Sequence, residues 1–125
     1  MNIIKKLFGK INLVTVRNEW GIADGADFLV ERQPDLKNIF TSDNPPSPWN
    51  PTQEKQRKWA SMSLSDKRFE LAMAYLGHPD PQVRASTIPF VKGIDAIGIQ
   101  LRFKEMLSDR SPIVQSAATQ VLRKG

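Results

Sequence analysis

The sequence has 125 residues, of which 40% are hydrophobic and 25% charged, and this composition suits one domain, residues 1–125, with a modest hydrophobic core. Cysteine is absent, which excludes disulfide bonds and thiolate metal sites, and no apolar run or signal-peptide pattern is present, so we expect no transmembrane segment and a cytoplasmic location. The net charge of +5 is spread evenly over both halves, which is more typical of a solvated surface than of a nucleic-acid-binding face.

The first 49 residues predict an irregular N-terminal capping region. Residues 1–8 form a short basic amphipathic pattern, which suits a helix packed on its own domain or one that contacts an anionic membrane surface. The β-branched stretch 11–16 predicts a short strand. Glycine and proline then divide the chain into two brief helical pieces, at 27–30 and 36–40.

A proline-rich segment, residues 41–51, follows this region and carries four of the nine prolines. Such a segment is a linker or an ordered binding loop. Trp49 within it is a candidate partner-binding residue if it is exposed, although a tryptophan that pins the loop to the core is the more common arrangement. Trp20 and Trp59 are expected in the core.

The second half of the chain contains an internal repeat with a period of 31 residues. Asp80-Pro81 and Ser111-Pro112 each place a helix-capping residue before a proline, which loses nothing at the first helical position. Asn50-Pro51, 30 residues upstream of Asp80, offers the same pair and indicates a degenerate first copy. We therefore expect helices to begin near these three positions.

Four further helices are predicted from the apolar spacing, at about 65–77, 81–93, 95–108 and 112–124. The first is expected to begin at Ser65 or Asp66, and Pro89 is expected to kink the second helix or remove one of its hydrogen bonds. The residues expected in the core are Phe69, Ala72, Met73, Leu76, Val83, Ile88, Phe90, Val91, Ile97, Leu101, Phe103 or Met106, Leu107, Val114, Ala117, Ala118, Val121 and Leu122.

These residues resemble a known family. Leu76, Asp80-Pro81 and Val83-Arg84, with their counterparts Leu107, Ser111-Pro112 and Val114, are similar to the short HEAT-like repeats of phycobilin lyases and many bacterial scaffold proteins. The resemblance covers about residues 50–125 and implies an all-α fold, a solenoid of short α-hairpins. It also implies that Asp80 and Arg84 tie neighbouring repeats together.

Motifs for catalysis are scarce in the sequence. His78 is the only histidine, and with no cysteine beside it a helix-capping or surface role is favoured over metal ligation. No phosphate-binding loop or nucleophile elbow is present. We therefore predict a protein that is not an enzyme and has no catalytic residues, metal or cofactor.

The family resemblance implies a small scaffold or adaptor that binds another protein on the face of its second helices. Lys92 and Arg123 are one period apart, and this row of positive charge favours an acidic partner, although cations at helix C-termini also complement the helix dipole. Nucleic-acid binding is an alternative, with tryptophans for base stacking. An inhibitor or immunity-type protein is another, and a role towards a bilin chromophore ranks last.

Overall fold

The computed structural model describes residues 12–16, 28–49 and 52–124, and it is mainly helical in this part of the chain. The predictions for residues 1–8, Trp20 and Asn50 lie outside the described residues. The elements, in chain order, are β1 (Leu13–Val16), β2 (Phe28–Glu31), α2 (Leu36–Thr41), α3 (Gln53–Ser61), α4 (Leu64–Leu76), α5 (Pro81–Val91), α6 (Ile97–Met106) and α7 (Pro112–Lys124).

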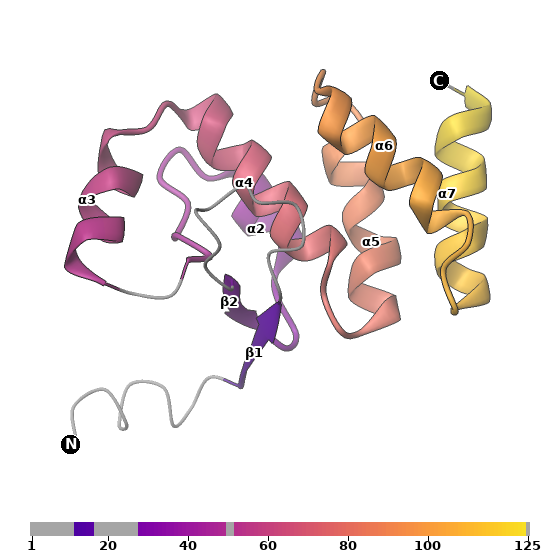
Figure 1. The fold of residues 1–125 in the computed structure, drawn as a ribbon, viewed down its shortest axis with the longest axis horizontal. Helices are drawn as coiled ribbons and strands as arrows, with labels where there is room; N and C mark the ends of the chain where they lie inside the picture. Colours follow the sequence, from indigo (N-terminus) through magenta and orange to yellow (C-terminus); the bar gives the residue numbers. More distant parts are fainter. Residues whose placement is uncertain (1–11, 17–27, 50–51, 125) are drawn as a thin grey trace.

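The last four helices form two hairpins that lie side by side (Figure 1). In the first hairpin α4 packs on α5, and in the second α6 packs on α7. Across the hairpins, α5 contacts α7 and α4 contacts α6, so that α4 and α6 make one layer and α5 and α7 the other. The α2 helix packs against the free side of α5, and the two hairpins coincide with the two copies of the 31-residue repeat.

A small antiparallel sheet precedes the helices. The strand predicted at 11–16 is confirmed as β1, whereas the helical piece predicted at 27–30 is wrong, because Phe28–Glu31 forms β2. The two strands pair from Val16 opposite Phe28 to Leu13 opposite Glu31. Phe28 and Val30 are buried while Glu31 is exposed, so the segment alternates as a half-buried strand does. The helix predicted at 36–40 is confirmed as α2.

The helix starts follow from side-chain caps. Asp80 Oδ1 accepts the Gln82 N–H at 2.9 Å and begins α5 at Pro81, as predicted. The two earlier starts differ from the sequence prediction. Helix α3 is capped by Thr52 and begins two residues after Asn50-Pro51, and α4 is capped by Ser63 instead of Ser65 or Asp66. In both helices a hydroxyl oxygen accepts a backbone N–H three residues on.

Helix α4 is the centre of the core. Every residue from 70 to 76 is buried, because the sheet and the proline-rich segment cover one side of the helix and the two hairpins cover the other. Figure 1 shows α4 running between these two groups of elements. The prediction of an amphipathic helix thus understated its burial, since a helix surrounded on all sides has no solvent face.

The face of α6 that packs inward differs from the predicted one. Ile97 is 79% exposed, Leu101 50% and Leu107 43%, whereas Ile99, Phe103 and Met106 are buried. Gly98 explains this orientation, since a Cβ at this position would lie 3.3 Å from the Phe69 ring, and the close approach of α6 to α4 fixes the rotation of α6. The prediction that Ile97, Leu101 and Leu107 are core residues is therefore wrong.

Most other core predictions are confirmed. Phe90 is an exception, because it is 40% exposed and stacks on Phe40 with a ring separation of 6.1 Å. Helix α5 continues through Pro89 and ends two residues later, so the proline acts by removing the N–H that would bond to the carbonyl of Ala85. The confirmed buried residues are Ala72, Met73, Leu76, Val83, Ile88, Val91, Phe103, Met106, Val114 and Ala118, with Phe69, Ala117, Val121 and Leu122 partly buried.

Arg84 joins the two hairpins. Its Nε and Nη2 donate to the two carboxylate oxygens of Asp109, at 3.0 and 2.8 Å, and its Nη1 donates to the carbonyls of His78 and Pro79. The side chains of this ion pair are only 15% and 10% exposed. The resemblance implied Asp80 as the partner of Arg84, but the Asp80 carboxylate caps its own helix, and Asp109 in the next turn takes this place.

Two leucine truncations test the corrected core. Leu76→Ala removes a side chain that is 0% exposed and is expected to lower the free energy of unfolding by about 2–5 kcal/mol, because the cavity collapses only in part. Leu107→Ala removes the same atoms from a side chain that is 43% exposed, and is expected to cost less than about 1 kcal/mol. Urea unfolding measures both, and similar losses in the two variants would contradict the orientation of α6.

A double-mutant cycle tests the link between the hairpins. Arg84→Ala is expected to cost about 2–3 kcal/mol, because it leaves the Asp109 carboxylate with reduced compensation at a site that is largely buried. Asp109→Ala in the Arg84→Ala background should then cost much less than in the native chain. Additive losses in the cycle, measured by urea unfolding, would show that the two side chains act independently.

Candidate functional site

A groove lies between the C-terminal halves of α5 and α7, with α6 as its floor. It encloses roughly 660 Å³. This volume is within the usual range for sites that hold a small ligand or a few side chains. Its described lining residues are Ile88, Pro89, Lys92, Gly93, Gln100, Phe103, Ala117, Gln120 and Val121.

Small side chains leave the groove open. Ala117 contributes only a methyl group from α7, and Gly93 contributes no side chain after the end of α5. A Cβ built on Gly93 would meet no atom within 4 Å, so the space beside it is open. Phe103, which is 1% exposed, closes the bottom. The groove therefore has an apolar floor and walls, and the two glutamines supply polar groups.

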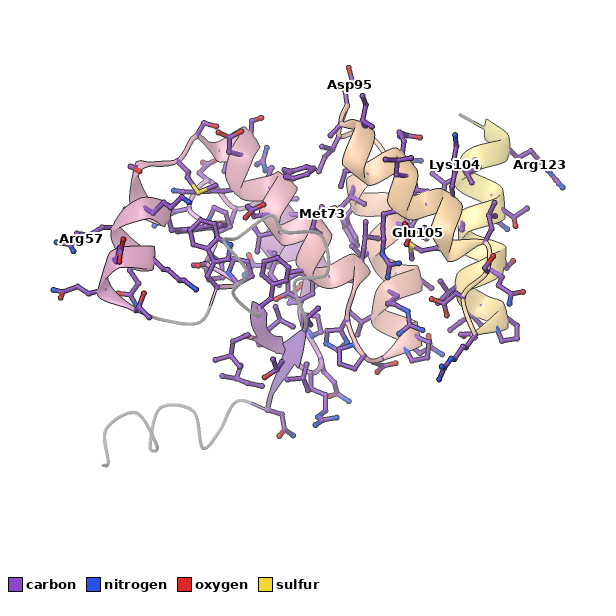
Figure 2. All side chains as sticks on the ribbon, viewed as in Figure 1. Arg57, Met73, Asp95, Lys104, Glu105 and Arg123 are labelled. Atoms are coloured by element: carbon purple, nitrogen blue, oxygen red, sulfur yellow. The ribbon has the colours of Figure 1, made fainter. Side chains whose placement is uncertain are left out.

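Lys92 supplies the charge of the groove. It caps the C-terminal end of α5 and its side chain is exposed, and it is the only charged residue among the described residues that line the groove. Arg123 is exposed one repeat later, but it is not among the described lining residues, and Figure 2 shows it projecting away from the C-terminal end of α7. Of the two predicted cations, Lys92 is thus the one that faces the groove.

Trp49 lies in the core. It is 5% exposed, its Nε1 donates to Oε1 of the buried Glu70 at 3.1 Å, and its backbone bridges to Phe28 of β2. The ring packs edge to face against Trp59, which is 6% exposed, at a centroid distance of 5.2 Å. Of the two interpretations of Trp49, the one in which it pins the proline-rich segment to the core is confirmed, and neither ring is free to stack on a base.

His78 is buried, which corrects the expectation of a surface position. It is 1% exposed, and its Nδ1 accepts the Asp80 N–H at 3.0 Å. Because Nδ1 accepts, the ring proton is on Nε2, which donates to the carbonyl of Glu31 at 2.9 Å. The ring also stacks on Tyr75. His78 therefore connects the end of β2 to the cap of α5 as a neutral imidazole.

The environment shifts the pKa values of two groups at this junction. Burial lowers the pKa of His78, against a smaller opposing effect of the Glu31 carbonyl. Burial alone would raise the pKa of Asp109, but the hydrogen bonds from Arg84 and from the Ser111 N–H lower it below its usual value. Burial also raises the pKa of the Tyr75 hydroxyl. The junction is thus built for a neutral His78 and an ionised Asp109.

Metal-binding groups do not gather in the described part of the chain. Within residues 12–16, 28–49 and 52–124, no three histidine, aspartate or glutamate side chains are close enough to hold a metal ion. None of the helices described there is long and apolar enough to cross a lipid bilayer.

Comparisons of the chain with protein-family models, with curated proteins and with solved structures find no significant match. No relative therefore supplies a function by similarity, and the groove and its chemistry carry the argument.

Sequence reasoning singled out Lys92 but missed most of the groove. Pro89 was considered only as a helix breaker, and Gly93 and Ala117 were given no binding role. Two small residues near the C-terminal ends of helices that are one period apart were the available signal. This signal becomes specific only when the contact between α5 and α7 is known.

The pH dependence of stability tests the assignment of His78. The lowered pKa means that the unfolded chain takes up the proton first, so the stabilisation by His78 is complete above about pH 6.5 and is lost as the pH falls below that value. Each pH unit within the window should reduce the free energy of unfolding by up to about 1.4 kcal/mol.

His78 is the only histidine in the sequence, so its ring signals are unambiguous in NMR spectra. The ¹⁵N shifts should show the Nε2–H tautomer and a titration midpoint below 6.5. Protonated Nδ1 at neutral pH, or a free energy of unfolding that is constant between pH 7 and 5, would contradict the assignment.

Proposed function

We propose that this protein is a non-enzymatic protein-binding module of the short HEAT-like type, a small scaffold or adaptor that holds a partner segment in the groove between α5 and α7. The observation that carries the proposal is the groove itself, which has apolar walls, two glutamines and one lysine. The partner segment has an apolar anchor side chain next to an acidic residue.

Two features support a repeat architecture. The period of 31 residues in the sequence coincides with the two hairpins, and equivalent helices of the hairpins contact one another. Arg84 links one turn to the next through Asp109, which is a contact between neighbouring units. Stacked helical repeats of this kind present the surface of their second helices as a binding face.

The chemistry of the groove defines the partner segment. Phe103 and Val121 offer an apolar surface, whose burial by an anchor side chain would provide most of the binding energy. Gln100 and Gln120 each have an amide that can both donate and accept, which suits the backbone of an extended peptide. The ammonium group of Lys92 favours a carboxylate beside the anchor and disfavours a basic segment.

A protein is a better candidate than a nucleic acid for this surface. A nucleic-acid groove carries several cations that follow the phosphate backbone, whereas Lys92 is the one charged residue in the described lining. The tryptophans that would support base stacking, Trp49 and Trp59, are buried among the core residues.

Three variants test the proposal by affinity capture from the native lysate with quantitative mass spectrometry. Lys92→Glu places a like charge opposite the acidic residue and is expected to reduce capture of the partner at least tenfold. Gly93→Leu fills the open space of the groove and is expected to have a similar effect, and it should not unfold the chain because its Cβ meets no atom. Arg123→Glu should have a smaller effect than Lys92→Glu, because Arg123 projects away from the groove.

Lys104→Glu on the exposed face of α6 is the matched control, and it should leave both capture and the melting temperature unchanged. Each capture is repeated after nuclease treatment. Partners that disappear with nuclease would favour the nucleic-acid alternative, and equal capture by all four variants would exclude the groove as the binding site.

A further inference from the structure

A second pocket lies at the opposite end of the molecule, between the proline-rich segment and helices α3 and α4 (Figure 1). It has a volume of roughly 370 Å³. The described residues around it include Pro45 and Pro46 from the segment, Trp59 from α3 and Lys67 from α4. It shares no described residue with the groove between α5 and α7.

The walls of this pocket are held in place by buried hydrogen bonds. Trp59 Nε1 donates to the carbonyl of Pro45 at 3.1 Å, and Trp49 Nε1 donates to Glu70 at the same distance. The two indole rings meet edge to face, and Pro45 is fully buried. The pocket is therefore preformed, and a ligand would not have to order its walls.

Two lysines from different helices give the pocket its charge. Lys55 on α3 and Lys67 on α4 both line it, and its described lining contains no carboxylate. Lys67 Nζ lies 5.8 Å from the centre of the Trp59 ring, so a cation–π contact holds this ammonium group at the pocket. Two positive charges in a partly enclosed site favour a ligand that has two negative charges.

We propose that this pocket binds a small phosphomonoester that carries a ring. The ammonium groups of Lys55 and Lys67 would neutralise the phosphate, which lysine binds as a point charge. Asn44 and Ser47 supply polar groups for its remaining oxygens. The faces of Pro46 and the accessible part of Trp59 provide an apolar surface for the ring.

The test uses NMR titrations of the whole chain with uridine 5′-monophosphate, uridine and inorganic phosphate as probes. The indole N–H of Trp59, which forms part of the wall, reports binding at the site. The monophosphate should shift this signal in a saturable manner, with an affinity at least tenfold higher than that of either uridine or inorganic phosphate. Equal affinity for uridine would overturn the role of the lysines, and equal affinity for inorganic phosphate would overturn the role of the apolar wall.

The double variant Lys55→Gln/Lys67→Gln should bind the monophosphate at least tenfold more weakly while its circular dichroism and melting temperature stay near those of the native chain. Lys37→Gln/Lys104→Gln removes the same charge from exposed positions on α2 and α6 and should leave the affinity unchanged. A similar loss in both double variants would show a general charge effect and overturn the site. The absence of any saturable shift in the native chain would overturn it as well.

Discussion

The arrangement of the hairpins depends on the planar guanidinium group of Arg84. One face of its fork takes both oxygens of Asp109 in the second hairpin, while Nη1 binds two carbonyls of its own turn. A lysine could not make this set of contacts, because its ammonium group lacks the fixed fork geometry. The contacts fix α5 and α7 side by side at their N-terminal ends. At the other ends of the same helices, Gly93 and Ala117 fill little space, and the groove opens there.

His78 extends this connection to the N-terminal part of the chain. Its ring binds the carbonyl of Glu31 on one side and the N–H of Asp80 on the other, so the end of β2 is joined to the start of α5 through one buried side chain. Both contacts require the neutral ring, because a proton on Nδ1 would face the Asp80 N–H. The carbonyl of the same residue also accepts from Arg84. The sheet, the first hairpin and the second hairpin thus meet within a few bonds of His78.

The sequence allowed the parts of the fold that local chemistry determines to be predicted. Asp80-Pro81 marks a helix start by itself, and the spacing of Val83 and Ile88 identifies the buried face of α5. The inward face of α6 could not be predicted, since Ile97 with Leu101 and Ile99 with Phe103 are equally spaced apolar pairs. Only the contact of Gly98 with Phe69 distinguishes them. The partner of Arg84 and the walls of the groove were equally hidden, because they come from residues far apart in the sequence.

The two candidate binding surfaces differ in the physics that would give them selectivity. The pocket beside Trp59 has two ammonium groups in its described lining, so the attraction of a phosphate dominates there and weakens as salt screens the charges. The groove has one lysine and a larger apolar surface, so burial of an anchor side chain dominates and salt affects mainly the rate of association. Because α4 is buried along the path between them, the two surfaces are mounted on one rigid core. Ionic strength should therefore separate their occupants, since raising it releases a ligand from the pocket before it releases a partner from the groove.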